Sequence, residues 1–123
     1  MKKILIYDDE EDIREICSII LTMKGYGVLC KDNCVQVIAD IEAYEPDVIV
    51  MDNWLPGMDG VQAIQLIKNT PSFHRIPVIF FSANTKAKEL GETAGADYIL
   101  SKPFEIAEFE KLVIAAIKIS PIL

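Results

Sequence analysis

Hydrophobic positions in this chain alternate between short continuous runs and longer segments with helical spacing. The runs at 4–7, 47–51 and 76–81 are apolar and rich in β-branched and aromatic residues, as in strands buried on both faces. Weaker strand signals at 27–31 and 97–101 each follow a glycine that can end a helix. The pattern therefore predicts five strands.

Between these strands, apolar residues recur every three or four positions. The first such segment carries Ile13, Cys17 and Leu21 on one side, polar residues on the other, and Gly25 as a stop signal. Further helices are expected at 35–43, 60–68, 86–94 and 105–118. Strands that alternate with helices predict the α/β class, as a doubly wound three-layer sandwich with a five-stranded parallel sheet.

Composition restricts the range of functions. A chain of 123 residues with 51% hydrophobic and 25% charged residues fits one compact domain, and no repeat or linker divides 1–123. The net charge of −7 disfavours direct binding to nucleic acid. The longest apolar run, 112–117, is far shorter than the roughly 20 residues of a spanning helix. We expect a cytoplasmic protein without a membrane segment, whose odd number of cysteines indicates reduced thiols.

Polar residues stand where the predicted strands end. Asp8 and Asp9 follow the first strand, Asp52 the third, Ser82 the fourth and Lys102 the fifth. The carboxyl ends of parallel strands meet at one edge, so these groups should converge there. Clustered carboxylates raise each other's pKa unless a hard cation lies between them, which indicates Mg²⁺. A lysine and a hydroxyl beside that cation suit a phosphoryl group.

Simpler roles exist for the same residues. Asp8 and Asp9 could cap the first helix, but their convergence with Asp52 favours function. For the acids at 10–12 we expect capping and interaction with the helix dipole only. Asp59 is expected to cap the third helix after a turn.

The sequence resembles the receiver domain of bacterial two-component response regulators, including the chemotaxis regulators. The likeness covers essentially the whole chain, so residues 1–123 would form one receiver domain with a flavodoxin-like (βα)5 fold. Four segments in order carry it: Ile-Leu-Ile-Tyr-Asp-Asp-Glu, Asp-Val-Ile-Val-Met-Asp-Asn-Trp-Leu-Pro-Gly-Met-Asp-Gly, Phe-Phe-Ser-Ala and Gly-Ala-Asp-Tyr-Ile-Leu-Ser-Lys-Pro-Phe.

The resemblance implies a role for each residue at the predicted site. Asp52 would accept the phosphoryl group, Lys102 would pair with it and Ser82 would supply the hydroxyl. The implied ligands of Mg²⁺ are Asp8, Asp9, Asp52 and the backbone carbonyl of Trp54.

The resemblance also implies partners. The donor would be a phosphohistidine on a sensor histidine kinase or a histidine phosphotransfer protein, and hydrolysis by the domain itself would remove the group. The domain would then signal by docking to an unidentified target protein or output domain, with weak homodimerisation as an open alternative. It would catalyse only its own modification and would not be an enzyme for other substrates.

Two departures from the family pattern affect how the signal is passed on. The aromatic residue that family members usually carry three positions before the lysine is replaced by Ile99, while Tyr98 should point to the opposite face of the sheet. We therefore expect readout through Ser82 and the segment after it, without ring rotation. Gly91 weakens the fourth helix, which we expect to be brief or mobile.

Three other functions compete with a phosphoacceptor. A Mg²⁺-dependent phosphatase would need a second acid two residues after Asp52, where Trp54 stands. A flavin-binding electron carrier would need a phosphate loop rich in Ser, Thr and Gly after the first strand, and this sequence lacks such a loop. A receiver-like interaction domain independent of phosphorylation would not need Asp8, Asp9, Asp52, Ser82 and Lys102. All of them are present in this sequence, which counts against this alternative.

Overall fold

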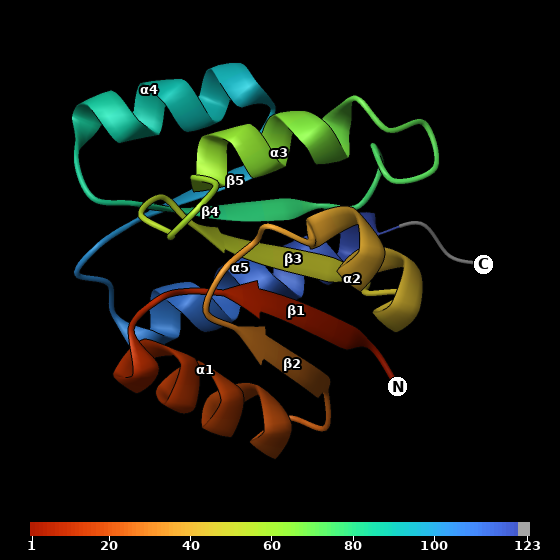
Figure 1. The fold of residues 1–123 in the computed structure, drawn as a ribbon. Coiled ribbons are helices and arrows are strands. Elements are labelled where there is room, and N and C mark those ends of the chain that lie inside the picture. The colour runs from red at the N-terminus through yellow and green to blue at the C-terminus, as the bar shows by residue number, and fades with distance from the viewer. Residues whose placement is uncertain (121–123) are drawn as a thin grey trace.

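A five-stranded parallel sheet lies between two layers of helices in the computed structural model, which describes residues 1–120 (Figure 1). Its strands and helices alternate throughout, in the order β1 Lys3–Tyr7, α1 Glu11–Met23, β2 Gly27–Lys31, α2 Val37–Tyr44, β3 Val48–Asp52, α3 Gly60–Lys68, β4 Val78–Ser82, α4 Thr85–Ala94, β5 Tyr98–Ser101 and α5 Ile106–Ile119. Within this part of the chain, no helix has both the length and the apolar composition needed to cross a membrane.

The strands follow the order β2-β1-β3-β4-β5, and every neighbouring pair is parallel. Helices α1 and α5 cover one face of the sheet, and α2, α3 and α4 cover the other (Figure 1). Because the chain starts in the middle of the sheet and winds outward in both directions, β1 and β3 are adjacent. The predicted doubly wound three-layer sandwich is confirmed.

Alternate residues of each central strand belong to two separate apolar clusters. Leu5, Ile49 and Phe80 face the layer of α2, α3 and α4, while Ile6 and Val50 face α1 and α5. Every residue of β3 and β4 is buried, as the continuous apolar runs predicted. Two filled interfaces fix the register of the strands, because a shift by one residue would exchange their faces.

The ends of the elements differ from the sequence expectation by one or two residues for local reasons. Strand β3 starts at Val48, and the carboxylate of Asp47 just before it accepts a hydrogen bond of 2.8 Å from the backbone N–H of Lys3. Helix α3 follows Asp59, whose side chain forms a capping box with Gln62, as predicted.

The fourth helix is not brief, and the alternative expectation that it is mobile stays a prediction. Helix α4 has 10 residues, and the Asn84 side chain caps it by accepting a hydrogen bond of 2.9 Å from the N–H of Ala87. Gly91 does not interrupt the helix because it is the point where the helix rests on the ring of Phe80. A Cβ atom at Gly91 would lie 2.5 Å from Cδ2 of Phe80.

Tyr98 and Ile99 occupy opposite faces of β5, as predicted. Ile99 packs with the cluster under α2, α3 and α4, and Tyr98 packs with the cluster under α1 and α5. The side of the sheet next to α4 therefore carries a branched aliphatic residue instead of an aromatic ring.

The three cysteines are free, and two of them are buried. Burial raises the pKa of the Cys17 thiol to about 12 and that of Cys34 to about 11. Both residues are therefore protonated at neutral pH and act as small apolar parts of the core.

Gly91→Ala tests the contact with Phe80. Helix propensity alone would stabilise the protein by about 1 kcal/mol. The structure instead predicts a loss of about 1–3 kcal/mol in the free energy of unfolding, because the buried ring has no room to move. Urea unfolding measures the sign, with Lys88→Ala at an exposed position of α4 as control.

The same substitution in a Phe80→Leu background should be much less destabilising, because the smaller side chain leaves space for the new methyl group. Stabilisation by Gly91→Ala in the otherwise unchanged protein would show that α4 is not held against Phe80.

Candidate functional site

Two acidic residues lie side by side at the ends of neighbouring strands. Tyr7 of β1 is paired with Met51 of β3, so Asp8 and Asp52 come next at the same edge of the sheet. Asp8 is completely buried and Asp52 is 4% exposed. The strand order and the register together therefore place two carboxyl groups in the interior.

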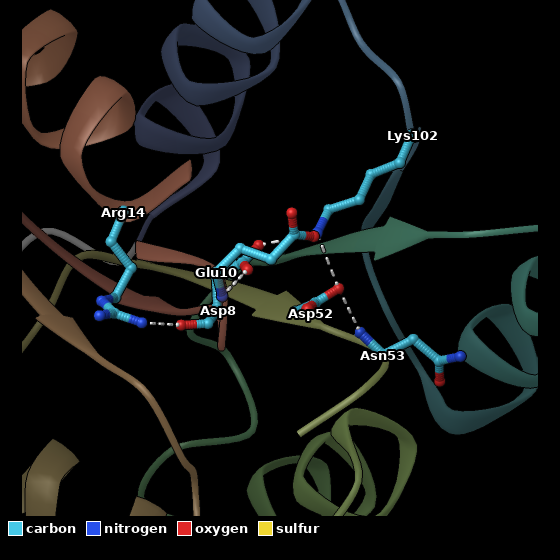
Figure 2. A network of polar contacts seen from close by, with 6 residues as sticks. All are labelled: Asp8, Glu10, Arg14, Asp52, Asn53 and Lys102. Atoms are coloured by element: carbon cyan, nitrogen blue, oxygen red, sulfur yellow. Dashed lines mark hydrogen bonds and ion pairs between the residues drawn. The ribbon is translucent and has the colours of Figure 1, made fainter. Parts of the chain in front are cut away.

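Lys102 reaches these two acids from the loop after β5 (Figure 2). Its Nζ lies 2.9 Å from Oδ2 of Asp8 and 3.2 Å from Oδ1 of Asp52. Its backbone N–H donates a hydrogen bond of 2.8 Å to the carbonyl of Ser82, and the Lys102–Pro103 peptide bond is cis. The prediction that Asp8, Asp52 and Lys102 converge is confirmed by these distances.

An aromatic cluster supports the lysine. Nζ of Lys102 lies 5.4 Å from the ring centroid of Phe81, and the Phe81 ring contacts Phe104 at 4.9 Å between centroids. Phe109 of α5 completes the cluster, 5.7 Å from Phe104. These phenylalanines have the apolar pattern of ordinary core residues, so the sequence did not indicate their position beside the lysine.

Burial shifts the pKa values of the acids upward. It raises the pKa of Asp52 to about 7, with a further increase from the charge of Asp8, although Lys102 and the N–H of Asn53 oppose the change. Burial also raises the pKa of Asp8. Burial lowers the pKa of Lys102, but hydrogen bonding to Asp8 and the charge of Asp52 outweigh it and leave this pKa raised. The site therefore favours an additional cation.

Backbone contacts hold the two acids in place. The guanidinium of Arg14 donates to the carbonyl oxygen of Asp8 at 2.9 Å, and the N–H of Asn53 donates to Oδ1 of Asp52 at 2.9 Å (Figure 2). A Cβ atom at Gly60 would overlap the carbonyl oxygen of Asp52. Glycine at this position therefore allows the start of α3 to approach the end of β3 closely.

The expectation that Glu10 only caps the first helix is wrong. Glu10 is the N-cap residue, but its side chain makes no capping hydrogen bond. Its carboxylate instead lies 3.4 Å from Nζ of Lys102, while its N–H donates to Oδ1 of Asp8 at 2.9 Å. The sequence did not indicate this contact because Glu10 and Lys102 are 92 positions apart.

The oxygen atoms around this edge suit a hard divalent cation. Carboxylate oxygens of Asp8, Asp9 and Glu10 lie within 4.8 Å of one another, and the buried Asp52 stands opposite Asp8. Several oxygen ligands with excess negative charge are the donor set of Mg²⁺. Trp54 lies two residues beyond Asp52, and 67% of its surface is exposed. Its backbone carbonyl remains a predicted ligand.

Ser82 stands at the same edge but outside the ion pairs. It is the last residue of β4, is 1% exposed, and its hydroxyl donates a hydrogen bond of 2.7 Å to the carbonyl of Asn84. The predicted hydroxyl is therefore near the end of the strand, but it is engaged with the segment that leads into α4.

Comparison with known protein families identifies this arrangement. The model of the response regulator receiver domain matches residues 4–114. The chain belongs to the response regulator receiver family. Among its relatives, the phosphate regulon transcriptional regulatory protein PhoB of Pseudomonas aeruginosa is 38% identical over 109 residues, which are 87% of this chain and 48% of PhoB. Regulatory protein AtoC of Escherichia coli is 32% identical over 125 residues, 97% of this chain and 26% of AtoC.

Receiver domains of known structure share the fold. A putative response regulator from Chloroflexus aurantiacus has a TM-score of 0.91 at 28% identity, over 95% of this chain and 98% of its own. The receiver domain of sensor histidine kinase PA1611 from Pseudomonas aeruginosa has a TM-score of 0.87 at 28% identity, with the same coverage, and holds a magnesium ion in its active-site cleft. The flavodoxin-like receiver fold is thus confirmed. The chain spans about half of the length of PhoB and about a quarter of the length of AtoC.

Asp52→Asn should stabilise the protein at pH 8 in the presence of EDTA. The carboxyl has a pKa of about 7 in the folded protein and an ordinary value of 3.8 in the unfolded chain, so its contribution to stability falls as the pH rises between these values. Because one pKa unit corresponds to about 1.4 kcal/mol, removing the charge should raise the free energy of unfolding by on the order of 4 kcal/mol at pH 8, and the gain should vanish below about pH 4. Urea unfolding across this pH range measures both.

Asp32→Asn, at an exposed position, is the control and should change stability little at either pH. Equal stability of Asp52→Asn and the unchanged protein at pH 8 would contradict the destabilisation assigned to the buried charge of Asp52.

Proposed function

We propose that residues 1–123 form one cytoplasmic receiver domain that takes a phosphoryl group onto Asp52 from a phosphohistidine. The donor is a sensor histidine kinase or a histidine phosphotransfer protein. One observation carries the proposal: the ammonium of Lys102 lies within ion-pair distance of two buried carboxylates, Asp8 and Asp52.

The contacts of Asp52 suit nucleophilic attack on phosphorus. Oδ1 accepts a hydrogen bond from the N–H of Asn53 and forms an ion pair with Lys102, which leaves Oδ2 as the attacking oxygen. A bond forms between this oxygen and phosphorus while the bond from phosphorus to the histidine nitrogen breaks, and the electron pair remains on the imidazole. Lys102 offsets the repulsion between the carboxylate and the phosphoryl oxygens.

Mg²⁺ completes the proposed chemistry. When bound, it would neutralise negative charge on the phosphoryl oxygens. The residues proposed to hold it are Asp8, Asp9, Asp52 and the backbone carbonyl of Trp54. The clustered oxygens of Asp8 and Asp9 and the raised pKa of Asp52 support this assignment.

Hydrolysis of the acyl phosphate on Asp52 by water would reset the domain. The chain would thus catalyse only its own phosphorylation and dephosphorylation, without turnover of other substrates. Ser82 would donate its hydroxyl to the phosphoryl group after leaving the carbonyl of Asn84, which it contacts at 2.7 Å. This exchange would carry the phosphorylation state to α4.

The output of this exchange would be docking to another protein. The target is a separate protein or an output domain outside residues 1–123, and weak homodimerisation is a second mode. The net charge of −7 argues that this chain does not itself contact nucleic acid.

Intact mass after incubation with Mg²⁺ and phosphoramidate or acetyl phosphate tests the acceptor. We expect a single phosphoryl adduct that requires Mg²⁺ and is absent in Asp52→Asn. Lys102→Ala should slow formation of the adduct by at least tenfold, because the positive charge that offsets the phosphoryl oxygens is lost. Asp59→Asn, which changes an acid outside the site, is the matched control.

The absence of an adduct with these donors, with phosphohistidine donors and with beryllofluoride would contradict the proposal. The chain would then be an interaction domain that does not depend on phosphorylation.

Beryllofluoride, which mimics a phosphoryl group on an aspartate, tests the route of the signal. We expect the Ser82 hydroxyl to leave Asn84 while the ring of Tyr98 keeps its position, because Tyr98 packs on the face next to α1 and α5. Backbone and ring NMR shifts in the presence and absence of beryllofluoride measure this. A rotated Tyr98 ring with an unchanged Ser82 would be the opposite result.

A further inference from the structure

We propose that Glu10 is a positioning residue that holds Lys102 in the resting state and competes with the incoming phosphoryl group for it. The inference rests on the proposed function of the same site. It concerns the one carboxylate in the cluster of Figure 2 that the family roles of Asp8 and Asp52 leave unexplained.

The contacts of Lys102 show why a competitor matters. An ammonium group has three N–H donors, and Nζ has three carboxylate neighbours: Asp8 at 2.9 Å, Asp52 at 3.2 Å and Glu10 at 3.4 Å. Of these three, Asp8 and Glu10 accept hydrogen bonds from Nζ, whereas Asp52 forms an ion pair with it. A phosphoryl group on Asp52 therefore competes with Asp8 and Glu10 for the N–H donors of this lysine.

Burial decides which contact is exchanged. The side chain of Asp8 is 0% exposed, so separating it from Lys102 would leave a buried charge without a partner. The side chain of Glu10 is 61% exposed, has the longest distance to Nζ and is solvated by water when it leaves. Glu10 is therefore the carboxylate that gives way.

The local structure allows this movement without disturbing α1. The N–H of Glu10 is fixed by its hydrogen bond of 2.9 Å to Oδ1 of Asp8, and its carbonyl accepts a bond of 3.1 Å from Arg14. The side chain makes no capping hydrogen bond, and its carboxylate accepts a hydrogen bond from Nζ of Lys102. The backbone stays anchored while the carboxylate turns away.

A second role for Glu10 leads to opposite expectations. Its carboxylate lies within 4.8 Å of ligand atoms of Asp8 and Asp9, so it could bind the metal instead of restraining the lysine. Loss of a metal ligand would weaken Mg²⁺ binding and slow phosphorylation. Loss of a competitor would leave Mg²⁺ binding unchanged and speed phosphorylation.

Three variants separate these roles. Glu10→Gln removes the charge, and Glu10→Asp keeps the charge but shortens the side chain by one methylene, so that it no longer reaches Nζ. Glu11→Gln, one residue along at an exposed position, is the control for the change in net charge. Each is compared with the unchanged protein at saturating Mg²⁺.

The first measurement is the rate of phosphorylation by phosphoramidate, followed by intact mass. We expect both Glu10→Gln and Glu10→Asp to react about two to five times faster, as suits the loss of one exposed ion pair, and Glu11→Gln to react at the original rate. The advantage of the Glu10 variants should shrink at high salt, which screens the exposed pair in the unchanged protein.

The second measurement is binding, followed by the fluorescence of Trp54, the one tryptophan in the chain. Mg²⁺ affinity should be equal in all variants, and beryllofluoride should bind more tightly to both Glu10 variants. Weaker Mg²⁺ binding by Glu10→Gln, or a Glu10→Asp variant that behaves like the unchanged protein, overturns the inference. An unchanged protein that accepts neither phosphoryl nor beryllofluoride overturns the proposed function itself, and the inference with it.

Discussion

Two buried carboxylates share one ammonium group at the edge of the sheet, and the rest of the structure maintains this imbalance. Asp8 and Asp52 follow paired residues of β1 and β3, so their proximity follows from the strand order. Burial without a full complement of cations raises the pKa of both groups. A protein selected for stability alone would replace one of them with an apolar residue. The arrangement is understandable if the missing positive charge is supplied by a bound cation.

The apolar core sets the geometry of these charges. Lys102 lies over the ring of Phe81, which itself belongs to the interface between β4 and α5 through Phe109. On the other side, Gly60 lets α3 approach the backbone of Asp52 without a side chain between them. Packing changes in either layer would therefore move the charged groups relative to each other. Stability of the layers and chemistry at the edge cannot be varied independently.

The sequence predicted the fold and the convergence of Asp8, Asp52 and Lys102 because both depend on local patterns. Apolar runs that end in Asp8, Asp52 and Ser82 indicate strands and their functional edge at once, and this information is contained within a few residues. It did not reveal that Glu10 contacts Lys102, because that contact joins residues 92 positions apart. It misjudged Gly91 for the same reason, since helix propensity is local and the contact with Phe80 is not.

Because Ile99 stands in place of an aromatic residue, we expect the signal to pass through the junction between β4 and α4. The carbonyl of Asn84 accepts from the Ser82 hydroxyl at 2.7 Å and also from the backbone N–H of Lys88 at 3.0 Å. If the hydroxyl turns toward a phosphoryl group, this oxygen keeps its helical partner, and the side chain of Asn84 still caps Ala87. The first turn of α4 therefore stays intact while its tether to β4 is released. Gly91 on Phe80 remains as a pivot, so the expected response is a tilt or displacement of a whole helix rather than its unfolding.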